Sequence, residues 1–427
     1  MKKLFAAGAA ILIALGGDVA VGQSISVPQI QSIGSADLFQ DVPNGNPQVG
    51  NRYASGGLLG NYSSTLPGNN PTNDLIGGDF GTNLYQDGAT VSTITTTTTY
   101  VADQWFAFSG TSTTIGGAEE TGASDITAGY TASERITRTG AGILQACVAQ
   151  IIPSANVTRY QGNIAEVDFN ALAGSGFSAA SSNLTVLLVQ GTGTNDSAVN
   201  FGKTVNSALA GTAWAGATTE TATVPISTTW ARYLSAFPVA TTTTEMGVAL
   251  CWTPVGASPS SDYFEFTGAQ LTPNSALASV AGTAGSYIGA NDQRAKSFLR
   301  RPVALENMLQ YQFYWKQTEP ASGAGVAGVY GWCQGTSTST IANCYMQFPV
   351  PMFKIPTLAY TAGTISATVG SAAAAEAVSG LVIATNGGTL FGANLTATSS
   401  SVSSGAFGFL QSGNSTGGGK IAFSARF

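Results

Sequence analysis

The chain has 427 residues and a formal net charge of −6. Only 9% of its residues are charged, whereas soluble domains usually contain about 25% charged residues. Histidine is absent, which excludes a Ser-His-Asp or Cys-His nucleophile and leaves only cysteines and carboxylates for a zinc site. Lysine and arginine form no cluster that would bind phosphates, so we expect no nucleic-acid partner.

In residues 1–23, Lys2 and Lys3 precede an uncharged apolar run from Leu4 to Leu15. Small residues follow, and Ala20-Val21-Gly22 resembles a cleavage site. The apolar run is too short to cross a bilayer but fits the central part of a signal peptide, so we expect no bilayer-spanning segment here. The alternative interpretation is an apolar anchor buried in a larger assembly.

Two segments flank the first region of predicted strands. Residues 24–72 are rich in Gly, Asn, Pro and Ser, which predicts a loop-rich N-terminal arm. Residues 73–275 contain β-branched and aromatic runs of six to ten residues separated by turn-forming clusters. This spacing favours an all-β protein with a jelly-roll-like β-sandwich. Residues 276–297 consist largely of amino acids with small side chains and are predicted to form a linker.

The last region, residues 298–427, is predicted to be a second, smaller β-sandwich module. It opens with a helix-favouring stretch in which Pro302 suits the first turn. A strand-favouring aromatic run follows, in which a period of two places Tyr311, Phe313 and Trp315 on one face. Such large apolar side chains suit burial between modules or between subunits.

Two charged residues near this helix are candidates for an inter-module or assembly contact. Arg301 and Glu306 lie on either side of the predicted helix start, where an ion pair would join the sandwich to the C-terminal module. The alternative is that both residues lie in a solvated turn.

Four cysteines are available for disulfides. Cys333 and Cys344 flank a polar, turn-like stretch, which suits a hairpin disulfide, and Cys147 and Cys251 both lie in strand-like runs. Four cysteines allow three pairings, and the spacing does not choose between them. Buried free thiols are the alternative if the protein does not meet an oxidising compartment.

Six short motifs occur in a fixed order along the chain. They are LIGGDFGTNLYQDG (Leu75–Gly88), YVADQW (Tyr100–Trp105), TTWARY (Thr228–Tyr233), FEFTGAQLTPNS (Phe264–Ser275), RRPVALENMLQYQFYW (Arg300–Trp315) and FPVPMFKIPTL (Phe348–Leu358). This series resembles the β-sandwich modules of tailed-bacteriophage structural proteins, mainly tail fibres and head or tail decoration proteins.

The resemblance implies a structural virion protein that has no enzymatic activity. Its expected partners are other virion subunits and a host-surface glycan, and it implies a homo-oligomer, most often a trimer. The second hypothesis is a secreted bacterial or prophage-encoded adhesin that binds carbohydrate at the cell surface after signal-peptide cleavage. Cleavage of the signal-peptide-like leader, residues 1–23, would distinguish the secreted adhesin from the virion protein.

One metal site is suggested by analogy with carbohydrate-binding jelly rolls, many of which hold a structural Ca²⁺ where the first and last strands pair. Asp79, Asp262 and Glu265 would lie close together in that arrangement. We expect no other cofactor.

Two further sets of residues suit carbohydrate chemistry. Of the tryptophans that suggest a sugar-stacking platform, Trp214 lies in a loop-like stretch and is the preferred ligand contact, because binding residues gather in loops. Glu166 and Asp168 alternate in a strand and so share a face, which suits a glycosidase pair or a Ca²⁺ site. The alternative for the two acids is a solvent-facing strand. The tryptophans considered are Trp105, Trp214, Trp230, Trp252 and Trp332.

Overall fold

The computed structural model describes residues 73–427 except 82–89, 123–126, 128, 195, 257–259, 283, 296, 320–328, 339, 361–364, 370–375, 400–401 and 413–418. These residues all belong to one compact unit, Gly56–Phe427. The expected leader and N-terminal arm lie outside the described residues. Within the described part, no helix has the length and apolar character needed to cross a membrane.

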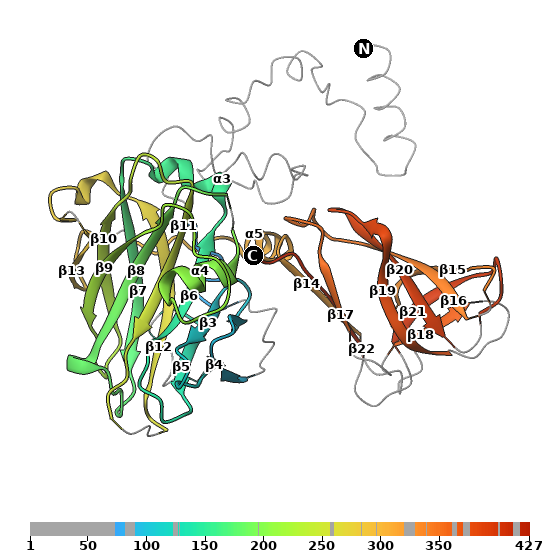
Figure 1. Ribbon diagram of the computed structural model, residues 1–427, viewed down its shortest axis with the longest axis horizontal. Helices are drawn as coiled ribbons and strands as arrows, with labels where there is room; N and C mark the ends of the chain where they lie inside the picture. The colour runs from blue at the N-terminus through green and yellow to red at the C-terminus, as the bar shows by residue number, and fades with distance from the viewer. Residues whose placement is uncertain are drawn as a thin grey trace, which may run out of the picture. The chain divides into compact units, whose positions relative to one another are not determined.

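Two antiparallel sheets form the first region, which confirms the prediction of an all-β sandwich (Figure 1). The seven-stranded sheet contains, in spatial order, β1 (Val91–Ile94), β4 (Ile115–Glu120), β5 (Ser133–Arg138), β12 (Tyr263–Pro273), β7 (Ile164–Ala173), β10 (Ala231–Pro238) and β13 (Ser286–Ala290). The six-stranded sheet contains β2 (Thr99–Tyr100), β3 (Phe106–Ser109), β6 (Ala146–Ile152), β11 (Glu245–Trp252), β8 (Asn183–Gly191) and β9 (Thr218–Pro225).

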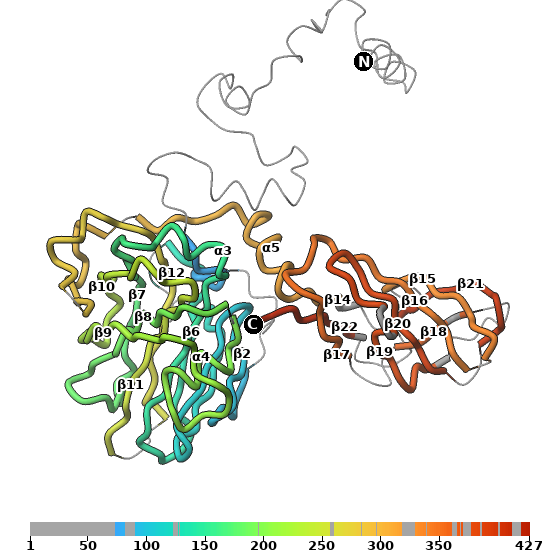
Figure 2. Tube along the Cα trace, turned by 45° about the horizontal axis from the view of Figure 1, so that its top comes forward, coloured from blue at the N-terminus to red at the C-terminus, as the bar shows by residue number. Residues whose placement is uncertain are grey.

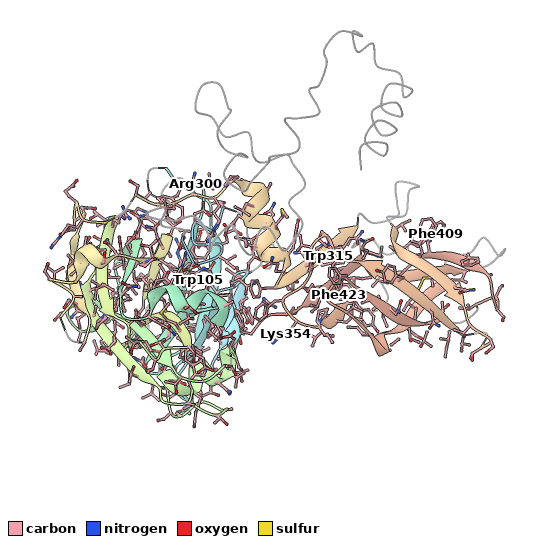
Figure 3. All side chains as sticks on the ribbon, turned by 90° about the horizontal axis from the view of Figure 1, so that it is seen from above. Trp105, Arg300, Trp315, Lys354, Phe409 and Phe423 are labelled. Atoms are coloured by element: carbon pink, nitrogen blue, oxygen red, sulfur yellow. A yellow bond between two sulfur atoms is a disulfide. The ribbon has the colours of Figure 1, made fainter. Side chains whose placement is uncertain are left out.

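The core between the two sheets follows from the strand period of two. In β7, Val167 and Phe169 point inward, and in β8, Val186 and Leu188 do the same. Trp105 belongs to this core, with its ring centroid 5.1 Å from that of Phe266. This tryptophan, one of the candidates for sugar stacking, is therefore a core residue, and Figure 3 shows its place in the sandwich.

Both outer faces of the sandwich are also covered. Helix α4 (Ala198–Val205) packs on the six-stranded sheet through Phe201. On the other sheet, Leu277 and Ala281 pack on the outward side chains of β10. The predicted linker 276–297 is therefore part of the sandwich, because it contributes β13 as an edge strand paired with β10. The remaining short helices are α3 (Ser154–Val157), η4 (Thr158–Tyr160), η5 (Ala180–Ser182) and η6 (Ser275–Leu277).

The C-terminal region begins with helix α5 (Val303–Tyr311), which starts directly after Pro302 as expected. A three-stranded sheet contains β14 (Tyr314–Glu319), β22 (Gly419–Ser424) and β17 (Thr357–Tyr360). A closed barrel contains β15 (Val329–Gly335), β16 (Ile341–Gln347), β20 (Gly392–Ser399), β19 (Glu376–Gly388), β18 (Ile365–Val369) and β21 (Phe407–Ser412) (Figure 2).

The barrel replaces the small two-sheet sandwich that the strand pattern predicted for this region. Closure gives every barrel strand two neighbours and removes the exposed sheet edges that promote aggregation. Its interior holds small and aliphatic side chains such as Ala342, Leu395 and Leu410. Because side chains alternate along each strand, the neighbours of these residues point outward.

Candidate functional site

The predicted Ca²⁺ site is not formed. Among the described residues, no three metal-ligating side chains gather at one place. Each of the three acids instead contacts a different arginine, a pairing that satisfies its charge within the fold. The contacts are Arg300 Nε to Asp79 Oδ2 at 3.2 Å, Arg138 Nε to Asp262 Oδ2 at 2.6 Å, and Arg135 Nη2 to Glu265 Oε1 at 2.6 Å.

The hypothesis that Trp214 contacts a ligand is wrong for the folded chain. Its side chain is only 4% exposed, and its ring lies edge-on to Phe201 with centroids 5.2 Å apart. The sequence pattern showed a loop of small residues but did not reveal α4, whose apolar side shares a cluster with this indole on the outer face of the sheet.

Glu166 and Asp168 share a face of β7, as the alternation predicted, but both are fully buried. Asn274 Nδ2 donates to Glu166 Oε2 at 2.6 Å, and Arg232 Nε donates to Asp168 Oδ1 at 2.9 Å. The pKa of Asp168 is raised to about 8, mainly because burial disfavours the charged form; the nearby Glu166 adds to the rise and Arg232 opposes it. A substrate has no direct access to carboxylates in this position, and they do not face solvent as the alternative proposed.

The four cysteines form two disulfides, Cys147–Cys251 and Cys333–Cys344. The second is the hairpin bridge suggested by the sequence, and both join residues directly opposite each other on neighbouring strands. All four sulfur-bearing side chains are buried. The open choice among three pairings is thereby resolved.

Arg301 and Glu306 join α5 to the start of the sandwich. Arg301 Nη1 lies 2.7 Å from Glu306 Oε2 and also donates to the Leu75 carbonyl at 3.1 Å, while Glu306 Oε1 accepts from the Gly77 backbone N–H. Glu306 is buried, so the pair forms an inter-module contact and not a solvated turn. A hollow of about 290 Å³ lies beside it, lined in part by Arg300.

The expected shared face of Tyr311, Phe313 and Trp315 does not exist. Tyr311 is the last residue of α5, and β14 begins only at Tyr314, so the strand period does not relate these positions. Phe313 lies 5.1 Å from Phe353. Trp315 stacks on Phe423 with ring centroids 5.7 Å apart, and Figure 3 shows these two rings together. These rings therefore pack within the C-terminal region of one chain.

The structure instead brings three aromatic residues together on the outside of the barrel. Trp332 of β15 lies directly opposite Tyr345 of β16 on one side and Phe409 of β21 on the other. The Trp332 and Phe409 ring centroids are 4.8 Å apart, and Trp332 and Tyr345 are 68% and 47% exposed. Figure 3 shows Phe409 at the outer surface of this module. We call these three residues the aromatic row.

Polar side chains lie at one end of the aromatic row and along one side of it. Asn394 of β20 lies opposite Tyr345, and a parallel set two residues along the strands contains Asn343, Gln334 and Phe407. The Phe407 side chain is 76% exposed. We call the aromatic row together with Asn394, Asn343, Gln334 and Phe407 the platform.

The hairpin disulfide determines how the platform is built. Cys333 and Cys344 are directly opposite and point into the barrel, so the residues beside them, Trp332 and Tyr345, are opposite each other and point outward. This part of the row was available from the sequence, as a bridged hairpin with an aromatic residue beside each cysteine. Phe409 was not, because β21 comes from more than sixty residues later in the chain.

Chemically, the platform presents exposed ring faces beside amide groups and no charge. Exposed apolar area of this kind marks a binding surface, because rings of this size offer large contact area in water. Amide side chains supply both hydrogen-bond donors and acceptors. A sugar ring matches both features, since its C–H face stacks on an aromatic ring while its hydroxyl groups bond to amides at the edge.

No protein-family model matches the chain. No curated protein matches it either. Among solved structures, it is similar to the enzymatically active domain of bacteriophage CBA120 tailspike protein 4, with 11% identity and a TM-score of 0.28. That match covers 47% of this chain and 21% of the tailspike chain.

Two carbohydrate-binding modules are also similar to parts of the chain. A CBM4 structure has 14% identity and a TM-score of 0.27, covering 46% of this chain and 98% of the other. The family 11 carbohydrate-binding module of a cellulosomal cellulase from Clostridium thermocellum has 7% identity and a TM-score of 0.25, covering 40% and 88%.

Proposed function

We propose that this chain is an attachment protein whose C-terminal barrel binds a surface glycan through the platform. The observation that carries the proposal is the aromatic row, in which three rings lie side by side on neighbouring strands with two of them at least 47% exposed. Buried aromatic residues stabilise a core, but an exposed row contributes little to folding and suits a ligand.

The biological setting that we propose is a tailed-phage virion, with the chain as a tail fibre or head decoration. The ordered series of six motifs supports this setting, and so does the construction of the chain from β modules with few surface charges to desolvate. Other virion subunits are the proposed partners, and the chain is proposed to form a trimer. Immunogold labelling of particles tests the setting, and light scattering tests the trimer.

We further propose that the chain binds without chemical turnover. The acids that best suited hydrolysis, Glu166 and Asp168, are buried and hydrogen-bonded within the sandwich. Incubation with polysaccharide, followed by reducing-end measurement, tests this point. The proposal of binding without turnover would be contradicted if the parent chain released reducing ends and the Glu166→Gln variant did not.

A second candidate function is a secreted carbohydrate-binding adhesin, and the two disulfides favour it. Structural disulfides form in oxidising compartments and are rare in cytosolic proteins. The signal-peptide-like residues 1–23 agree with this route. A mature N-terminus at Gln23 or Ser24 by mass spectrometry supports the adhesin, whereas an intact Met1 in particles supports the virion protein.

The glycan proposal is tested with a microbial polysaccharide array probed by the full chain and by a Trp332→Ala variant. We expect Trp332→Ala to lose the signal. The matched control is Phe391→Ala, which removes an aromatic ring that is 62% exposed but lies outside the platform. Equal binding by all three proteins would contradict the proposal.

A further inference from the structure

We infer that the platform selects an uncharged, extended glycan that lies across the barrel strands and is gripped along its length. This inference rests on the proposed glycan attachment and names the ligand class of the same site. It follows from three features of the platform, namely its charge, its direction and its openness.

The charge of the barrel region indicates a neutral ligand. From Pro320 to Phe427 the chain has four charged residues, Lys354, Glu376, Lys420 and Arg426, and none belongs to the platform. Arg426 lies over the Tyr100 and Tyr314 rings, Lys354 interacts with Asp196, and Lys420 lies on β22 outside the barrel. An acidic polysaccharide would require cations at the contact, because recognition of carboxylate or sulfate groups uses Arg or Lys.

The direction of the aromatic row indicates how the ligand lies. Its members occupy adjacent strands, and neighbouring strands are about 4.8 Å apart, so the three rings extend about 10 Å perpendicular to the strands. Consecutive sugar units of an extended chain therefore meet consecutive rings. A compact or strongly coiled glycan would contact only one ring at a time.

The amide groups beside the rings supply the polar contacts. Within the part of the chain that the structure describes, the side chains of Asn343, Gln334 and Asn394 form no hydrogen bond with the protein. Their donors and acceptors are therefore available to ligand hydroxyl groups. Because the platform is an exposed sheet surface, with Trp332 68% exposed, the ligand can continue past the row at either side. Internal segments of a polymer are thus bound as well as its ends.

Isothermal titration calorimetry on the full chain tests this inference with β-linked glucose oligomers from the disaccharide to the hexasaccharide, and with hyaluronan as the acidic probe. We expect the affinity to rise with length until the ligand covers the row and then to level off. The affinity should not depend on salt. Trp332→Ala should weaken binding about tenfold or more, as for a central aromatic hot spot.

Matched variants separate the polar and apolar contributions. Gln334→Ala should weaken binding several-fold while leaving the dependence on ligand length unchanged. Phe391→Ala should bind like the parent chain. If hyaluronan binds more tightly than the neutral oligomers and is released by salt, the inference of a neutral ligand is overturned, although attachment through Trp332 still stands.

Other outcomes overturn more than the ligand class. If no glycan depends on Trp332 in either experiment, both the inference and the proposed function fail. If Trp332→Ala lowers the chain mass in light scattering from an oligomer to a monomer, the platform is an interface between copies of this chain. In that case the glycan assignment is wrong.

Discussion

The sandwich and the barrel are both built from antiparallel strands, but they use their aromatic and charged residues in opposite ways. In the sandwich, Trp105 and Trp252 are buried, and acids such as Asp262 and Asp168 are paired with arginines. In the barrel, Trp332 and Phe407 face solvent, and the surrounding strands have almost no charge. The sandwich therefore uses these side chains for internal stability, whereas the barrel leaves its aromatic side chains exposed, as the proposed glycan attachment requires.

Removing the disulfide of each region should have the largest effect on the free energy of unfolding. Cys147–Cys251 closes a segment of 104 residues and Cys333–Cys344 one of 11 residues. Loop entropy predicts that removing them by paired Cys→Ala changes costs about 5 and about 3 kcal/mol of unfolding free energy, respectively. Urea denaturation of the two double variants measures both values. A larger loss from the barrel pair would contradict the loop-entropy explanation.

Replacing one tryptophan in each region should give the clearest contrast. Trp105→Ala leaves a cavity in the sandwich core and should cost about 3–5 kcal/mol of unfolding free energy. Trp332→Ala removes an exposed ring and should change the free energy by no more than about 0.5 kcal/mol. Equal losses in denaturant titrations would mean that the aromatic row supports the fold and is not reserved for a ligand.

Asp262→Asn tests the buried charges of the sandwich. Arg138 and Asp262 are both fully buried, and the guanidinium also donates to the Gly142 carbonyl at 3.0 Å. Removing the carboxylate leaves a buried cation without its counter-ion and should cost about 3–5 kcal/mol. Asp292→Asn, which breaks an exposed pair with Arg294, is the control and should cost less than about 1 kcal/mol. Similar values for both variants would be the contrary result.

A pH dependence of the sandwich tests the buried Asp168 carboxyl. Burial raises the pKa of Asp168 to about 8, far above the ordinary value of 3.8, so the folded state holds a proton that the unfolded chain releases. Stability should therefore fall as the pH rises from about 4 to about 8. Asp168→Asn should flatten this part of the curve when the melting temperature is measured against pH. An unchanged slope would show that another group titrates.

Local patterns were sufficient to predict the all-β class, the first sandwich and the helix start at Pro302, because alternation and turn chemistry act over a few residues. The sequence also contained part of the platform, because the bridged Cys333–Cys344 hairpin places Trp332 opposite Tyr345. Phe409 could not be assigned, because pairing between β15 and β21 depends on how the barrel closes.

The failed predictions have the same cause. Trp214 looked exposed because an eight-residue helix, α4, left too weak a pattern to show what covers it. Asp79, Asp262 and Glu265 looked like metal ligands because the sequence does not show which arginine approaches each acid in three dimensions. Long-range pairing, and not residue type, decides both outcomes.

The most direct test of glycan binding at the aromatic row is acrylamide quenching of tryptophan fluorescence in the full chain, with and without a saturating neutral glucose oligomer. Trp332 is much more exposed than the buried Trp105, Trp214 and Trp252. Its emission is obtained as the difference between the parent chain and Trp332→Phe. The ligand is predicted to shift this emission to shorter wavelength and to protect it from the quencher. Saturated binding that leaves the quenching of Trp332 unchanged would contradict the assignment of the site.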